Sequence, residues 1–122
     1  MADSKCVLIV DDNVRVRQAL RSLFTLNGFE VCGEAVNGLD AIEKAKELHP
    51  DLILLDLSMP LMNGLEAARN LSKIMPDVPL MMFTTDGAAP LVEEAHRAGI
   101  VEVVSKMGPY SMLVTQARKL LN

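Results

Sequence analysis

Short aliphatic runs alternate with longer amphipathic stretches along the whole chain. The aliphatic runs predict five strands, at 6–10, 29–35, 52–55, 80–83 and 101–105. Between and after them, apolar residues recur every three or four positions, which predicts five helices, at 14–27, 39–48, 65–75, 90–98 and 110–121. Strands that alternate with helices predict βαβ units and a parallel sheet covered on both faces, although several strand orders satisfy this pattern.

Capping residues set the expected ends of two of the helices. Asn13 is a suitable N-cap for the first helix, and Gly28 is a suitable stop after it. The second helix is expected to close at His49, because the residue before a proline is disfavoured in the α-helical conformation.

The third strand and the loop after it form the centre of the pattern. Residues 52–55 are consecutive aliphatic residues without polar alternation, as expected for a strand buried on both faces. The run stops at Asp56, and Pro60, Asn63 and Gly64 then predict a loop. A carboxylate at this end of a parallel strand lies where open α/β folds bind ligands, although an Asp can also simply cap a turn.

Composition limits the classes of function. A length of 122 residues suits a single domain, 1–122, and the net charge of −4 leaves no basic stripe for nucleic-acid phosphates. No apolar run approaches the roughly 20 residues that a membrane span needs, and the N-terminus lacks a secretory signal pattern. Cys6 and Cys32 lie in strand-like runs without CxxC spacing, which favours buried, reduced thiols in the cytoplasm over a disulfide.

Polar residues follow four of the predicted strands, at the edge where parallel strands present their carboxyl ends. They are Asp11, Asp12, Asp56, Thr84 and Lys106. Carboxylates brought together repel one another, and at least one has its pKa raised unless a cation intervenes. Mg²⁺ suits such a site, because it takes oxygen ligands and acts beside phosphates with one or two carboxylates.

This set of residues predicts phosphoryl chemistry. With the metal bound, Asp56 can stay ionised and act as a nucleophile toward phosphorus. The transferred group presents three charged oxygens. The metal can compensate one oxygen, Lys106 another, and the hydroxyl of Thr84 with backbone N–H groups the third. Thr85 is an alternative hydroxyl, but Thr84 directly follows the apolar strand.

Together these features resemble the receiver domain of two-component response regulators, over essentially the whole chain. They comprise the acid pair after the first strand, the run Leu-Asp-Leu-Ser-Met-Pro-Leu-Met-Asn-Gly around Asp56, Thr84 after the fourth strand, and Lys106 after the fifth. The resemblance implies a flavodoxin-like (βα)5 fold, with a doubly wound five-stranded parallel sheet of order 2-1-3-4-5.

The resemblance also implies a function in a two-component system or phosphorelay. Asp56 would accept a phosphoryl group from a sensor histidine kinase or a histidine phosphotransfer protein, and the domain would catalyse this transfer and a slow dephosphorylation. Mg²⁺ would be bound by Asp12, Asp56 and the backbone carbonyl of Ser58, with Asp11 reaching it directly or through water. The chain is therefore expected to be a phosphoacceptor regulator rather than an enzyme.

Phosphorylation would change partner binding through a movement of Thr84, followed by the 85–90 loop and the fourth helix. Two positions depart from the family pattern. Receivers usually carry Tyr or Phe three residues before the lysine, and here that switch position is Val103. Many receivers follow the lysine with a cis proline, whereas here Met107 follows Lys106, and the isomer of that peptide bond stays open.

Two other functions compete with this one. A haloacid-dehalogenase-like phosphohydrolase also uses an aspartate nucleophile, Mg²⁺ and a lysine, but it needs a second acid where this chain has Ser58. A pseudo-receiver would bind partners without phosphorylation. Val103 leaves room for that function, whereas the intact acid set argues against it.

The sequence says less about partners and output. Arg15, Val16, Ala19 and Leu20 share a helix face beside the acid pair, which is either simply exposed or docks the phosphodonor protein. The chain stops after the last predicted helix, so we expect it either to act on a separate downstream protein or to be the receiver part of a longer regulator. The stretch 106–110 resembles receivers that precede DNA-binding helical domains more than it resembles stand-alone receivers, which favours the second alternative.

Overall fold

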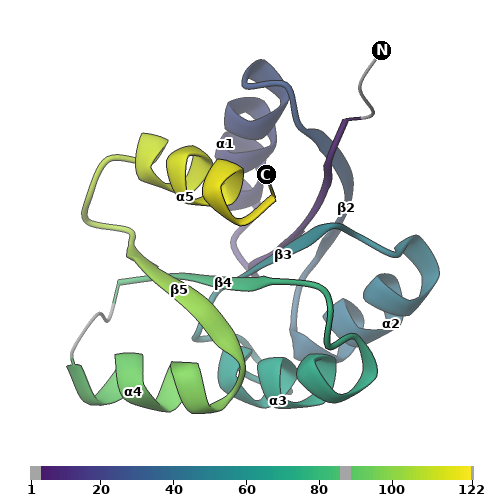
Figure 1. Ribbon diagram of the computed structural model, residues 1–122, viewed down its shortest axis with the longest axis vertical. Helices are drawn as coiled ribbons and strands as arrows, with labels where there is room; N and C mark the ends of the chain where they lie inside the picture. The colour runs from purple at the N-terminus through teal and green to yellow at the C-terminus, as the bar shows by residue number, and fades with distance from the viewer. Residues whose placement is uncertain (1–3, 86–88, 122) are drawn as a thin grey trace.

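The computed structural model describes residues 4–85 and 89–121, and within them five strands alternate strictly with five helices. The strands are β1 (Cys6–Val10), β2 (Glu30–Ala35), β3 (Leu52–Leu55), β4 (Leu80–Thr84) and β5 (Ile100–Ser105). The helices are α1 (Val14–Leu26), α2 (Gly38–Leu48), α3 (Gly64–Ile74), α4 (Ala89–Arg97) and α5 (Ser111–Leu121). All strand pairs are parallel, in the order β2-β1-β3-β4-β5 (Figure 1). The predicted flavodoxin-like α/β fold is confirmed.

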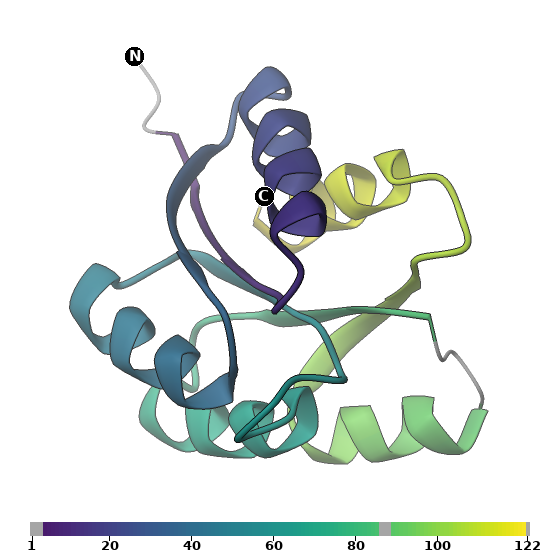
Figure 2. The same cartoon turned by 180° about the vertical axis from the view of Figure 1, so that it is seen from behind.

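Helices cover both faces of the sheet. Figures 1 and 2 show α1 and α5 on one face and α2, α3 and α4 on the other. Each face has its own apolar core: Leu20, Phe24 and Leu113 belong to the first, and Ala41, Ala68 and Leu71 to the second. This three-layer arrangement buries the central strands β1, β3 and β4 almost completely, whereas the edge strands β2 and β5 stay partly exposed.

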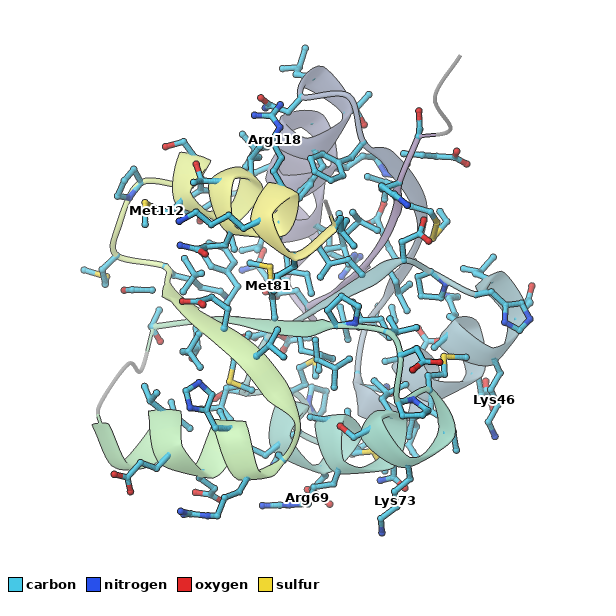
Figure 3. All side chains as sticks on the ribbon, viewed as in Figure 1. Lys46, Arg69, Lys73, Met81, Met112 and Arg118 are labelled. Carbon is cyan, nitrogen blue, oxygen red and sulfur yellow. A yellow bond between two sulfur atoms is a disulfide. The ribbon has the colours of Figure 1, made fainter. Side chains whose placement is uncertain are left out.

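Strand β3 lies in the middle of the sheet and contributes to both cores. Leu52 and Leu54 pack toward α1 and α5, whereas Ile53 and Leu55 pack toward α2, α3 and α4. All four are at most 1% exposed, so the absence of polar alternation follows from burial on both faces. The neighbouring strand behaves in the same way, and Figure 3 shows its Met81 between the sheet and α5.

The predicted helix caps are confirmed. The side chain of Asn13 accepts hydrogen bonds from the backbone N–H groups of Arg15 and Val16. Gly28 follows α1 with φ of 86°, and α2 ends before His49, whose φ is 50°. Every other element end agrees with the predicted one or differs from it by one residue.

The prediction for the cysteines is wrong. Cys6 and Cys32 form a disulfide between β1 and β2, with a Cα–Cα distance of 5.5 Å, and neither residue is fully buried. They meet because the register shifts from Val7 opposite Val31 to Leu8 opposite Gly33, which leaves Cys32 as the extra residue of a bulge in β2. Pattern reasoning could not anticipate a bulge, and the cytoplasmic location loses the support of reduced thiols.

Three further expectations can be compared with the fold. Leu20 is only 1% exposed and belongs to the core. The predicted face of Arg15, Val16, Ala19 and Leu20 therefore cannot serve as a docking surface in full. No cis peptide bond occurs among the described residues, so Lys106–Met107 is trans. Among the same residues no helix is long and apolar enough to cross a membrane. Residues 86–88 of the expected mobile loop lie outside the described residues.

Candidate functional site

Strand register places Asp11 and Asp56 side by side. Val10 pairs with Leu55 at the carboxyl ends of β1 and β3, so the two acids follow paired residues on adjacent strands. The backbone N–H of Asp56 donates to the Val10 carbonyl at 2.9 Å. Asp11 is 2% exposed and Asp56 8%, so both carboxylates are largely withdrawn from water.

Lys106 reaches the two acids from the far side of β4. It directly follows β5, and its backbone N–H donates to the carbonyl of Thr84 at 2.8 Å. Its side chain crosses beside the Phe83 ring and brings the ammonium nitrogen to 2.9 Å from Asp11 Oδ2 and 3.2 Å from Asp56 Oδ1. One lysine therefore bridges carboxylates carried by two other strands.

The charges of this group explain its titration. Burial raises the pKa of Asp56, and the negative charge of Asp11 raises it further, against a partial lowering by Lys106. For Lys106, burial acts to lower the pKa, but the hydrogen bond to Asp11 and the charges of both acids outweigh it and raise the pKa. The lysine is therefore a permanent cation at neutral pH, although one cation does not balance the acids around it.

The three acids form a candidate cation site. One carboxylate oxygen from each of Asp11, Asp12 and Asp56 can be chosen so that all lie within 4.8 Å of one another. Two ligands on one Mg²⁺ lie at most about 4.2 Å apart, so a small side-chain adjustment would place all three on one ion. Asp12 is exposed and lines an open cleft of about 570 Å³ together with Ser58, which leaves space for water and a phosphoryl group. The all-oxygen donor set fits Mg²⁺.

The loop after β3 is packed closely against the site. The backbone N–H of Gly64 donates to the Leu57 carbonyl at 2.8 Å. A Cβ atom at Gly64 would overlap the backbone carbonyl oxygen of Asp56, so this position needs glycine. Within the same loop Leu61 has φ of 68°, a left-handed conformation that is unfavourable for leucine.

The structure also shows where the other predicted site residues, Thr84, Ser58 and Val103, lie. Thr84 ends β4, is 3% exposed and lies next to Lys106 through the backbone hydrogen bond. Ser58 is exposed in the cleft beside Asp12. Val103 pairs with Met82 and packs against the core on the α2–α4 side.

Sequence reasoning missed one residue at the site. Arg17, on α1, donates from Nη1 to the backbone carbonyl of Asp11 at 2.8 Å. It also forms an ion pair with Glu34 on β2, with 2.9 Å between Nε and Oε1. The available signal was a charged residue on the inward side of an amphipathic helix, three positions before the buried Leu20.

Comparison with known proteins decides the family. The sequence model of the response regulator receiver domain matches residues 7–118. The chain belongs to this family. The receiver domain is 40% identical to the chemotaxis protein CheY of Thermotoga maritima over 115 aligned residues. The alignment covers 94% of this chain and 96% of that protein.

Other relatives of this receiver domain are longer or were solved in complexes. A putative transcriptional regulator of Pseudomonas aeruginosa is 36% identical over 115 residues, and the match covers 94% of this chain but only 56% of that protein. A crystal structure of the CheX-CheY-BeF3-Mg²⁺ complex from Borrelia burgdorferi has a TM-score of 0.92 at 26% identity, covering 97% of this chain and 90% of that one. The receiver domain is thus a signal-transduction domain with an acidic pocket.

Proposed function

We propose that this receiver domain, residues 1–122, is a phosphorylation-activated switch of a two-component system or phosphorelay, located in the cytoplasm. The observation that carries the proposal is that Asp56 lies close to the carboxylates of Asp11 and Asp12 and also pairs with the Lys106 ammonium. A carboxylate in this setting has an anion-compensating cation and a candidate metal site within reach of the same oxygen atoms.

The chemical step follows from this arrangement. An Asp56 carboxylate oxygen attacks the phosphorus of a phosphohistidine on a sensor histidine kinase or histidine phosphotransfer protein, forming a P–O bond. The P–N bond to the imidazole breaks, and the nitrogen keeps the electron pair. Lys106 compensates one developing charge on the phosphoryl oxygens, and the Thr84 hydroxyl is assigned to another. The same groups support slow hydrolysis back to the free carboxylate.

Mg²⁺ would be held by Asp12, Asp56 and the backbone carbonyl of Ser58, with Asp11 bound directly or through water. When bound, the ion supplies positive charge that lets the acids stay ionised together and that neutralises the incoming phosphoryl oxygens. The CheY of the Borrelia complex was crystallised with Mg²⁺ and BeF3, which supports this assignment.

Output would proceed through Thr84 and the elements after it. A phosphoryl group on Asp56 adds charge and strong acceptors beside Thr84 and Lys106, so α4 and β5, which lie between these two residues in the chain, are the elements expected to carry the change. At Val103 the usual aromatic residue is replaced by a smaller side chain, so we infer that the switch acts by other packing changes. The recipient is a downstream protein or an output domain beyond these residues, as the longer regulator from Pseudomonas illustrates.

Phosphorylation with a small phosphodonor tests the proposal. Incubation with an acyl phosphate and Mg²⁺ is expected to add one phosphoryl group, detected by intact-protein mass spectrometry, that survives acid better than base. Asp56→Asn should abolish the modification because the nucleophile is lost. Lys106→Ala should slow it on the order of 100-fold, because one preorganised positive charge is removed.

Chelation of Mg²⁺ by EDTA serves as the control and should stop the wild-type reaction. Phosphate that persists on the Asp56→Asn variant would contradict the proposed nucleophile. A wild-type protein that stays unmodified with Mg²⁺ and excess donor would instead favour a pseudo-receiver. Turnover of phosphate esters is not expected, because Ser58 occupies the position of the general acid in dehalogenase-like phosphohydrolases.

A further inference from the structure

The backbone between the two adjacent acids is held by a side chain from α1. The carbonyl of Asp11 belongs to the peptide group that joins Asp11 to Asp12, and it accepts a hydrogen bond from Arg17 Nη1 at 2.8 Å. The Arg17 side chain is only 14% exposed, so this bond is shielded from water. The orientation of that peptide group determines where the Asp12 side chain points.

Arg17 is itself fixed by β2. Its Nε donates to Glu34 Oε1 at 2.9 Å, while Arg21 donates to the other carboxylate oxygen at 2.7 Å. Burial acts to raise the pKa of Glu34, but hydrogen bonds from Arg21 and Arg17 outweigh it and lower the pKa overall. The Glu34 carboxylate is therefore ionised at neutral pH and keeps the planar guanidinium of Arg17 aligned with Asp11.

The remaining polar groups of Asp11 already have partners. Its backbone N–H donates to Ala35 at 3.0 Å, Oδ1 accepts from the backbone N–H of Asn13 at 2.8 Å, and Oδ2 is paired with Lys106. The Arg17 bond is the contact that holds the carbonyl side of this residue. Without it, a shielded carbonyl would lose its donor and the peptide group would be free to rotate.

We propose that Arg17, oriented by Glu34, is a positioning residue that sets the Asp11–Asp12 doublet in the geometry needed to bind Mg²⁺. This inference rests on the proposed function, because it takes the doublet as part of the metal site. Groups that orient metal ligands without touching the metal contribute about 10- to 100-fold to metal affinity in other proteins.

Charge alone predicts the opposite result. Arg17 is a cation near a cation site, so removing it should strengthen Mg²⁺ binding if only Coulomb repulsion mattered. Loss of positioning should weaken binding instead. Arg21 offers a matched control, because it carries the same charge and contacts the same Glu34, one helical turn further from Asp11.

Isothermal titration calorimetry of the full chain with MgCl2 measures the affinity for Mg²⁺ and tests the inference without any phosphoryl donor. Arg17→Ala is expected to weaken Mg²⁺ binding about tenfold, and Arg21→Ala to change it by less than about twofold. Arg17→Lys should recover part of the loss, since an ammonium can reach one acceptor but not hold both. Amide NMR shifts of Asp12 and Asn13 should move in Arg17→Ala and not in Arg21→Ala.

Glu34→Gln extends the test to a variant that keeps Arg17 and the shape of its partner, and it should weaken Mg²⁺ binding by an intermediate factor. Equal or tighter Mg²⁺ binding by folded Arg17→Ala, or an equal loss in Arg21→Ala, would overturn the positioning role while leaving the proposed function intact. If Arg17→Ala does not fold, Arg17→Lys and Glu34→Gln decide in the same way. Absence of Mg²⁺ binding in the wild type would overturn the proposed function and this inference together.

Discussion

At the scale of single residues, the site is assembled at a cost to stability. Asp56 is buried next to Asp11, so the folded protein disfavours the ionised carboxylate that the proposed chemistry needs. Leu61 adopts a left-handed backbone conformation that leucine rarely accepts. Both features lie around the candidate phosphoacceptor, where function and stability commonly conflict.

The first prediction concerns Asp56. The pKa of Asp56 in the folded protein is raised above the ordinary value of 3.8. The folded state therefore loses stability relative to the unfolded state as the pH rises from that ordinary value through the raised one. Asp56→Asn should therefore increase the free energy of unfolding at pH 7 without Mg²⁺, by an amount of the order of 1 kcal/mol.

Urea unfolding followed by circular dichroism at pH 7 and near pH 4, in EDTA, measures this difference. The advantage of the Asn variant should shrink at the lower pH, because the raised pKa means that more of the wild-type carboxyl is protonated there. Lys106 keeps its 2.9 Å contact with Asp11 in the variant, so loss of its pairing should not mask the effect. A wild type that is more stable than Asp56→Asn at pH 7 would contradict the argument.

A second prediction concerns Leu61, which is 81% exposed and therefore contributes little packing. Asn tolerates a φ of 68° better than leucine does, so Leu61→Asn should raise the free energy of unfolding by about 0.5–1 kcal/mol. Leu61→Val is the matched control and should lower it, because β-branching makes the left-handed conformation less accessible. Thermal melts of the three proteins give the order, and a Val variant as stable as the Asn variant would show that the backbone is not strained.

At the scale of elements, the pairing of β1 with β2 decides what the cysteines do. The bulge in β2 adds one residue opposite β1 between Val7 and Leu8 and brings Cys32 to Cys6. The disulfide joins two parallel strands whose cysteines are 26 positions apart in the chain. It thus closes a covalent loop that contains all of α1.

The third prediction follows from that loop. Reducing a disulfide that closes a loop of this length should lower the free energy of unfolding by about 3–4 kcal/mol, because the unfolded chain regains conformational freedom. Both cysteines are partly exposed, so a reductant has access. Urea unfolding with and without reductant measures the change.

The double variant Cys6→Ala, Cys32→Ala controls for direct effects of the reductant, and its free energy of unfolding should be the same with and without reductant. Thiol titration of the unreduced, denatured wild type should give no free thiol. Two titrable thiols in that sample would contradict the disulfide itself, and an unchanged urea midpoint on full reduction would contradict its stabilising role.

At the scale of the whole molecule, the site exists only when the sheet is complete. Asp11 and Lys106 are 95 positions apart and meet only through the order and register of β1, β3, β4 and β5. The unfolded chain cannot present the three acids to one ion, so metal binding and folding are coupled.

The fourth prediction is that Mg²⁺ stabilises the protein. At a concentration about 100 times the dissociation constant, the free energy of unfolding should rise by about 2.7 kcal/mol, and EDTA should remove the increase. Asp12→Asn should abolish most of the effect while changing the metal-free stability little, because Asp12 is exposed. Differential scanning calorimetry over a range of MgCl2 concentrations measures it, and equal melting temperatures with Mg²⁺ and with EDTA would contradict the site.

The sequence by itself determined the features that depend on local chemistry. Uninterrupted aliphatic residues at Leu52–Leu55 require a strand buried on both faces, and Asn13 and Gly28 act within a few residues of where they stand. Because parallel strands present their carboxyl ends at one edge of the sheet, the polar residues that follow the strands necessarily lie near one another at that edge. The roles assigned to those residues remain predictions.

The tertiary structure decided the features that depend on which distant residues meet. The bulge that joins Cys6 to Cys32 leaves no local signal, and a charged residue on the inward side of α1 does not by itself show that Arg17 bonds to the Asp11 carbonyl. The burial of Leu20 likewise depends on how α1 lies on the sheet. Each follows from strand register and helix placement, which are set by the packing of the whole chain at once, and a pattern read along one segment does not contain that information.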